Sequence, residues 1–191
     1  MTDLLDIKKQ KEEIRKEIKG ILRRKTPVLR VEESRNIQGE LVSSKEFNTS
    51  KTVMTYVSLP DEVDTMYFIE KALERGKKVA VPYIDDTDNT IIAVRLTSKI
   101  ELVKGRFGIY EPKDGPAGKV DLKEIDLIVV PGIAFDKKNM RLGRGKGYYD
   151  RFLSDPNLSS AISIGLAYKC QIVNLLPSAS HDRPVMRVIT D

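Results

Sequence analysis

The stretch between residues 52 and 82 reads as a strand, a helix and a second strand joined by short connections. Thr52–Leu59 is rich in β-branched and aromatic residues, which favour extended backbone. A helical pattern follows at Glu62–Arg75, Gly76 ends it, and Lys78–Pro82 is a short apolar strand. Two strands joined by a helix pair in parallel through a right-handed crossover. This unit therefore predicts a parallel sheet covered by helices.

Further apolar runs extend the predicted sheet. Asp126–Pro131 is almost continuously apolar, which is typical of a central strand buried on both faces. Three other segments read as strands: Ile91–Leu96, Ala161–Leu166 and Val185–Thr190. The remaining stretches read as a helix with a connection at 30–50, a turn at 85–90 and a loop at 105–120.

These elements predict an α/β fold with three layers, in which a mostly parallel central sheet lies between helices on both faces. The length of 191 residues fits one compact domain, and we interpret residues 1–191 as that single domain. No apolar run approaches the roughly 20 residues that span a bilayer, and the N-terminus lacks the apolar core of a signal peptide. The lone Cys170 cannot form an internal disulfide. We therefore expect a cytoplasmic protein that does not bind membranes.

The net charge of +5 is concentrated near the N-terminus, where residues 1–35 hold eleven Lys and Arg against seven Asp and Glu. The pattern predicts a helix from Leu4 to about Lys25, with one buried stripe formed by Ile14, Ile18, Ile21 and Leu22. Lys11 and Arg15 project close to this apolar stripe. They either run along its edge with their charges in solvent or reach an anion where the helix packs, and periodicity alone leaves both interpretations open.

A glycine-rich segment, residues 130–153, follows the predicted central strand (VPGIAFDKKNMRLGRGKGYYDRFL). Its three alternate glycines let backbone N–H groups approach an anion, and cationic side chains stand between them. These residues are Gly143, Gly145 and Gly147, interleaved with Arg141, Arg144 and Lys146. The segment matches neither a Walker loop nor a dinucleotide-binding fingerprint. It favours a phosphate or other anion site, although a solvated surface loop would also fit the spacing.

This segment closely resembles the signature of the 5-formyltetrahydrofolate cyclo-ligases, in the order Pro-Gly, Phe-Asp, Arg-Leu-Gly and Gly-x-Gly-Tyr-Tyr-Asp. Three further segments are similar to the same family: Lys11–Arg15, Val57–Glu62 and the His-Asp-x-Pro-Val element that begins at His181. The resemblance spans residues 8–190. It departs from the family at Met186, where the family often has an aspartate.

The resemblance implies a role for each matching residue. The ATP-binding residues would be Lys11, Arg15, Arg141, Leu142, Gly143, Arg144, Gly145, Lys146, Gly147, Tyr148 and Tyr149. The folate-binding residues would be Val57, Glu62, Arg144, Gly145, Lys146, Gly147 and Tyr148. Among these, Arg144, Lys146 and Tyr148 would be catalytic, and Asp150 and Asp182 would hold Mg²⁺. Singly, Asp150 also fits a helix surface, Asp182 a turn, and Glu62 a helix N-terminus.

The implied reaction uses ATP and Mg²⁺ to convert 5-formyltetrahydrofolate to 5,10-methenyltetrahydrofolate, with release of ADP and phosphate through a phosphorylated formyl intermediate. The expected partners are a reduced folate and ATP, with no nucleic acid, and the chain is expected to be a monomer. Two alternatives stay open. One is another enzyme class on a related α/β scaffold, such as a sugar-phosphate isomerase or a coenzyme A transferase. The other is a nucleic-acid-binding module that uses the basic helix and the Arg-Lys loop.

Overall fold

The computed structural model describes the whole chain except residues 1–3, 86 and 106–109. Its centre is a six-stranded sheet in the order β11-β9-β6-β1-β2-β3. These strands are β1 (Thr52–Thr55), β2 (Lys78–Asp85), β3 (Thr90–Leu96), β6 (Leu127–Val130), β9 (Ile162–Leu166) and β11 (Arg187–Ile189). All neighbours pair in parallel except β2 and β3, which are antiparallel. The prediction of a mostly parallel sheet is confirmed.

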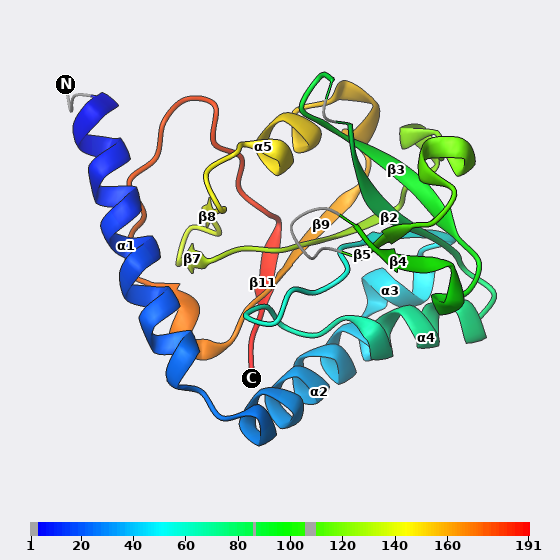
Figure 1. The fold of residues 1–191 in the computed structure, drawn as a ribbon, viewed down its shortest axis with the longest axis horizontal. Coiled ribbons are helices and arrows are strands. Elements are labelled where there is room, and N and C mark those ends of the chain that lie inside the picture. The colour runs from blue at the N-terminus through cyan, green and yellow to red at the C-terminus, as the bar shows by residue number, and fades with distance from the viewer. Residues whose placement is uncertain (1–3, 86, 106–109) are drawn as a thin grey trace.

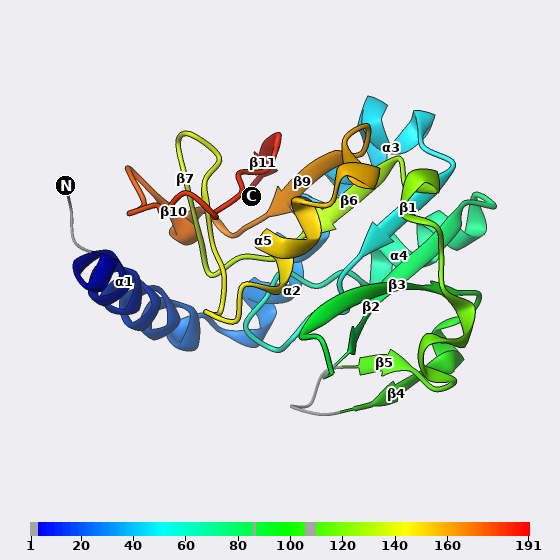
Figure 2. The same ribbon diagram turned by 90° about the horizontal axis from the view of Figure 1, so that it is seen from above.

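Two small sheets and five α-helices complete the described fold (Figure 1). The small sheets are β4 (Leu102–Lys104) with β5 (Tyr110–Pro112), and β10 (Ile172–Val173) with β7 (Ala134–Asp136) and β8 (Arg141–Leu142). The helices are α1 (Leu4–Arg24), α2 (Pro27–Ser43), α3 (Lys45–Thr49), α4 (Met66–Glu74) and α5 (Tyr148–Leu153). In Figures 1 and 2, α1 lies on the side of the molecule away from β4 and β5.

The hydrophobic core has two parts, one on each face of the sheet. Successive strand residues point to opposite faces, so Val53 packs with one part and Met54 with the other. The first part contains buried residues of α1 to α4, such as Leu22 and Phe68. The second contains Phe152 of α5. Helices thus cover both faces, as the three-layer prediction requires.

The unit at residues 52–82 has the predicted topology but shorter elements. β1 ends at Thr55, and the chain then forms a loop that Thr65 ties back by donating from Oγ1 to Tyr56 O (2.7 Å). α4 begins at Met66, whose N–H donates to the Asp64 carboxylate (2.9 Å). The prediction of a strand to Leu59 and a helix from Glu62 was therefore wrong at these ends, because polar groups of the intervening loop satisfy each other.

Other boundaries also differ from the predictions. The second helix begins at Pro27 rather than near residue 30, because proline suits the first helical position and Thr26 caps it by accepting from the Leu29 N–H (3.3 Å). The turn predicted at 85–90 is shorter in the structure, because β2 includes Asp85 and β3 begins at Thr90. The predicted loop at 105–120 contains β5, and part of it lies outside the described residues.

Candidate active site

The glycine-rich segment leaves the carboxyl end of β6, forms the β7–β8 hairpin and ends in α5. Gly145 and Gly147 have φ values of 103° and 68°, a left-handed conformation that glycine adopts at little cost. At Gly143, an added Cβ would lie 2.5 Å from Arg141 Nη1. Backbone conformation therefore favours glycine at 145 and 147, whereas a side chain at 143 would displace the Arg141 guanidinium.

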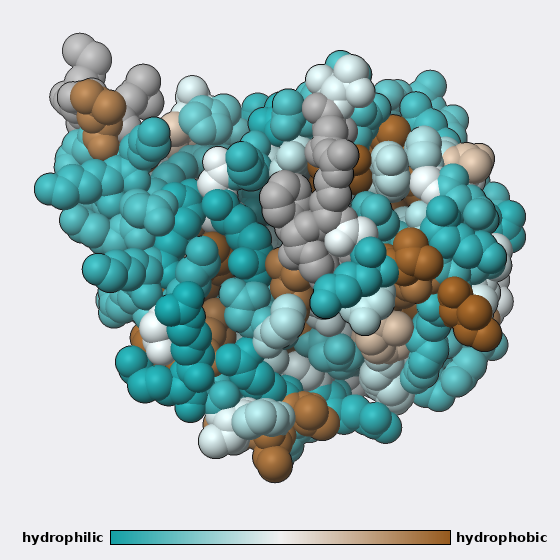
Figure 3. Space-filling model, in the orientation of Figure 1, coloured by the Kyte–Doolittle hydropathy of each residue, from teal (hydrophilic) through white to brown (hydrophobic). Residues whose placement is uncertain are grey.

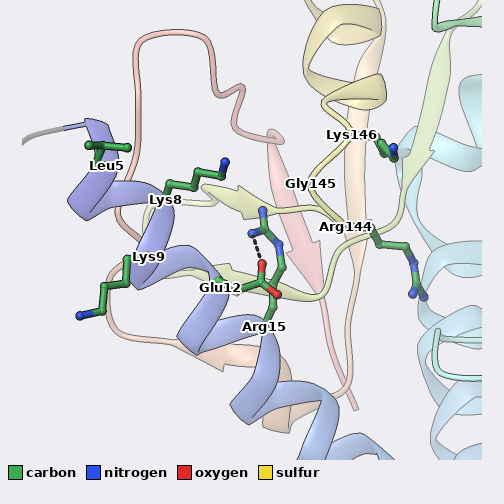
Figure 4. Close-up of a pocket in the computed structure, with 8 residues that line it drawn as sticks. All are labelled: Leu5, Lys8, Lys9, Glu12, Arg15, Arg144, Gly145 and Lys146. Atoms are coloured by element: carbon green, nitrogen blue, oxygen red, sulfur yellow. Dashed lines mark hydrogen bonds and ion pairs between the residues drawn. The ribbon is translucent and has the colours of Figure 1, made fainter.

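A pocket of about 610 Å³ lies between α1 and the tip of this segment (Figure 4). It is lined by Leu5, Lys8, Lys9, Glu12, Arg15, Arg144, Gly145 and Lys146. Five of these residues carry a positive charge and one a negative charge, so the pocket attracts anions. The α1 side of the molecule is mostly hydrophilic in the space-filling view (Figure 3). This is the place where an anion bound by the glycine-rich segment would lie.

The two cationic residues near the apolar stripe of α1 both make specific contacts. Arg15 Nε donates to Gly143 O (2.9 Å), and its Nη1 pairs with Glu12 (3.1 Å). Lys11 Nζ pairs with Asp182 Oδ2 (2.5 Å). Their side chains are only 11% and 13% exposed, so they do not simply extend into solvent. Arg15 reaches the pocket, whereas Lys11 reaches the turn that carries Asp182.

The two aspartates that were expected to bind metal lie on adjacent segments. Asp150, in α5, pairs with Arg141 at 2.9 Å and accepts from the backbone N–H of Arg183 (3.2 Å). Asp182 immediately precedes Arg183 in the chain. The fold therefore brings together two carboxylates that are 32 positions apart in the sequence. Each has a cationic partner, Arg141 for Asp150 and Lys11 for Asp182.

Asp182 is held in its ionised form. Burial acts to raise its pKa, but the Ala179 N–H (2.6 Å) and the Lys11 ammonium outweigh that effect and lower the pKa below the ordinary value for aspartate. His181 lies 3.9 Å from the same carboxylate and is largely exposed. Its exposed position on the turn favours a role as a turn residue over a catalytic one.

Arg144 joins the glycine-rich segment to the loop after β1. Its Nη2 lies 2.5 Å from Asp61 Oδ1 and 3.0 Å from Glu62 Oε1. Burial raises the pKa of Glu62, and the Arg144 guanidinium and the Leu59 N–H oppose part of that rise. Val57 is buried in the same loop. The residues that were expected on the folate side therefore lie next to the segment that was expected to bind nucleotide.

The two tyrosines of the segment differ in their surroundings. Tyr148 donates to Asn89 Oδ1 (3.4 Å), and the Arg151 guanidinium lies 5.4 Å from its ring centroid. The Tyr149 hydroxyl is buried and has no hydrogen-bond partner among the described residues. Burial and the nearby Glu62 carboxylate raise the pKa of Tyr149 well above its ordinary value. Tyr149 therefore stays neutral, and Arg141 stacks over its ring at 5.6 Å.

The residues of this site that were not anticipated from the sequence include Lys8, Asp61 and Asn89. Lys8 carried a signal, because it lies three and seven positions before Lys11 and Arg15 and so shares their helix face. Asp61 and Asn89 carried none, because both stand in polar turns where such residues are common. Only the fold brings them to the glycine-rich segment.

A model of the 5-formyltetrahydrofolate cyclo-ligase family matches residues 7–191. The chain belongs to this family. The match covers every residue named in the site above except Leu5. It confirms the resemblance seen in the sequence and the interpretation of the chain as an enzyme, a ligase.

Relatives and a solved structure give the same result. The chain is 30% identical over 181 residues to 5-formyltetrahydrofolate cyclo-ligase of Haemophilus influenzae, covering 94% of this chain and 97% of that one. It is 32% identical to the Mus musculus cyclo-ligase, covering 92% and 91%. It is similar in structure to 5,10-methenyltetrahydrofolate synthetase of Aquifex aeolicus, with a TM-score of 0.81, 34% identity and coverage of 94% and 89%. The α/β fold class is confirmed.

The membrane prediction is tested only for helices. Within the described part of the chain, no helix is both long enough and apolar enough to cross a membrane.

Proposed function

We propose that this cyclo-ligase family member converts 5-formyltetrahydrofolate and ATP to 5,10-methenyltetrahydrofolate, ADP and phosphate. The observation that carries the proposal is the position of Arg144. This residue belongs to the lining of the cationic pocket and also contacts Glu62 in the loop after β1. A nucleotide in the pocket and a folate at Glu62 would therefore share this arginine, as a phosphoryl transfer between them requires.

The proposed chemistry begins with transfer of the γ-phosphoryl group from ATP to the formyl oxygen. Transfer turns a poor leaving group into phosphate. The nitrogen that links the ring system to the benzoyl group then attacks the formyl carbon and loses its proton, and phosphate departs with the former formyl oxygen. The protein contributes position and charge rather than covalent chemistry.

Each site residue has a distinct part in this proposal. Arg15 and Lys146 bind phosphate oxygens from opposite sides of the pocket, and Arg144 stabilises charge on the group in transfer. Val57 and Glu62 line the pterin side. Tyr148 lies at the start of α5, where its ring can contact a flat ligand. Arg141 fixes the conformation of the glycine-rich segment, because its almost fully buried side chain forms an ion pair with Asp150.

We further propose that Asp150 and Asp182 hold Mg²⁺. Among the described residues, no group of three or more His, Cys, Asp or Glu side chains could hold a metal ion. Two carboxylates on adjacent segments nevertheless fit Mg²⁺, which takes few protein ligands and completes its shell with phosphate oxygens and water. When bound, the ion would neutralise phosphate charge. Lys11, the partner of Asp182, would then face the same phosphates, and Arg141 would keep the segment in place.

The magnesium proposal has its own test. Asp150→Asn and Asp182→Asn should each raise the Mg²⁺ concentration needed for half-maximal activity, with little change in folate affinity measured without nucleotide. Calorimetric titration of Mg²⁺ into the complex with a non-hydrolysable ATP analogue gives a second readout. Unchanged titrations in both variants would remove these residues from metal binding.

One assay tests the overall proposal. The absorbance of methenyltetrahydrofolate should rise when 5-formyltetrahydrofolate, Mg²⁺ and ATP are all present, and not when ATP is omitted. Product formed without ATP would favour another enzyme class on this scaffold. The single domain, the monomeric state and the cytoplasmic location stay predictions, and sedimentation of the purified chain tests the second of them.

A further inference from the structure

The guanidinium of Arg144 points away from the α1 side of the pocket where an anion is proposed to bind. In Figure 4 its side chain extends away from Lys8 and Arg15, two of the cationic residues that α1 contributes to the pocket. Two carboxylates hold it there: Nη2 contacts Asp61 (2.5 Å), and both Nη2 and Nε contact Glu62 Oε1 (3.0 and 3.2 Å). The charge assigned to phosphate is therefore neutralised within the protein.

We propose that Asp61 is a positioning residue which, with Glu62, holds the Arg144 guanidinium away from α1, an arrangement that we call the parked position. We further propose that folate releases this arginine by binding to Glu62. Asp61 has no role in the function proposed above. The inference rests on that function, because it takes the folate site at Glu62 and the phosphate role of Arg144 from it. It adds a reason why the two substrates should favour each other's binding.

The contacts of Glu62 explain how folate would release Arg144. Glu62 Oε2 accepts from the Leu59 N–H (3.0 Å), whereas Oε1 is bonded to Arg144 alone among the contacts of the described residues. A pterin ring carries neighbouring N–H donors, which suit a carboxylate acceptor. Such donors compete with the guanidinium for Oε1. Once Glu62 is engaged, Asp61 is the remaining partner of Arg144 in this cluster.

The pair that remains is weak enough to exchange. The Asp61 and Arg144 side chains are 31% and 38% exposed, and ion pairs exposed to this degree contribute little. A phosphate group offers more acceptor oxygens than one carboxylate and binds arginine in a bidentate manner. With folate in place, Arg144 therefore turns to the nucleotide. Without folate, the parked arginine keeps the nucleotide site incomplete.

This arrangement makes the two substrates thermodynamically coupled. Folate raises the affinity for nucleotide, and by linkage nucleotide raises the affinity for folate by the same factor. Removing the Asp61 charge weakens the parked position, so nucleotide should bind more tightly before folate arrives. The enhancement by folate should then be smaller, because part of the release has already occurred.

The test is calorimetric titration of an imido analogue of ATP, with Mg²⁺, into the purified protein with and without 5-formyltetrahydrofolate. We expect Asp61→Asn to bind the analogue up to about fivefold more tightly than the wild type without folate, the size of one exposed ion pair. The enhancement by folate should shrink by the same factor. Asp61→Glu keeps the charge and should restore the wild-type behaviour.

Glu74→Gln is the matched control, because it breaks an exposed Lys–Glu pair in α4 and should change neither affinity. Unchanged or weaker analogue binding by Asp61→Asn would overturn the proposal, as would a wild-type protein in which folate does not affect nucleotide affinity. The second result decides the matter even if the variant fails to fold. A wild type that neither binds the analogue nor forms product would instead overturn the proposed function.

Discussion

Arg141 and Arg144 are three residues apart in the same segment, yet the structure gives them opposite surroundings. Arg141 is 3% exposed, belongs to β8 and pairs with the mostly buried Asp150. Arg144 is 38% exposed, lies beyond β8 and pairs with Asp61 and Glu62. Both make ion pairs of similar length. What differs is the exposure of the two guanidinium groups, since Glu62 is as buried as Asp150. The exposure of the arginine influences how much each pair contributes and how readily it exchanges partners.

The comparison shows that the glycine-rich segment has two parts: a base that fixes its conformation and a tip whose cations are available to a ligand. The base of the segment is fixed by a buried charge pair and by a ring stacked under Arg141. Its tip carries exposed cations beside Gly145 and Gly147, whose positive φ values favour glycine. A charge that must meet a substrate is useful at the tip, and a charge that must not move is useful at the base.

The strongest way to break this comparison is Arg141→Ala. Removal of the guanidinium leaves Asp150 largely buried without its partner, and we expect the free energy of unfolding to fall by about 3–5 kcal/mol. Arg144→Ala, the variant at the tip, should lose less, about 1–3 kcal/mol, because its guanidinium is 38% exposed and Glu62, although 12% exposed, keeps the Leu59 N–H as a donor. Urea unfolding of both variants measures the difference. Equal losses would mean that burial does not separate the two arginines.

The tip is tested by activity rather than stability. Arg144→Ala and Lys146→Ala should each lower kcat by about 10²–10³-fold, because each removes a cation aimed at charge that develops in the transition state. Both variants should stay folded at the temperature of the assay. Initial rates at saturating ATP and folate provide the measurement. A variant with near-normal turnover takes its residue out of the catalytic role.

The α1 residues extend the comparison to the other side of the pocket. Lys11→Ala and Arg15→Ala should raise the KM for ATP about tenfold, the equivalent of losing one charge-assisted hydrogen bond, and change the KM for folate less. Lys16, exposed on α1, supplies the control Lys16→Ala. If the two residues are only structural, the variants will melt earlier with an unchanged KM for ATP.

The smallest effect concerns Asp182, whose side chain is 8% exposed and pairs with Lys11, which is 13% exposed. Its pKa in the folded state lies below the value of about 3.9 for an unperturbed aspartate, so its contribution to stability is present above that pH. The contribution is lost as the pH falls through the lowered pKa. Asp182→Asn should therefore cost about 1 kcal/mol at pH 7 and much less near pH 2. An equal loss of unfolding free energy at both pH values would contradict a lowered pKa for Asp182.

Much of the fold could be predicted because it depends on local patterns. The apolar runs at 78–82 and 126–131 and the helical period of α1 state which residues must leave water. Boundaries were less predictable. Glu62 looked like a helix residue, but its carboxylate accepts from Leu59 and Arg144 instead, and a competition of that kind is invisible to periodicity.

The sequence by itself determined the family, the parallel sheet and the residues of the glycine-rich segment, because each is a matter of order or period along the chain. Only the tertiary structure decided their partners. Lys11 meets Asp182 across 171 positions and Arg144 meets Asp61 across 83. The physical reason is that such pairs form wherever the packing of helices and loops on the sheet brings charges together, and a local pattern specifies which face a charge occupies but not what lies opposite it.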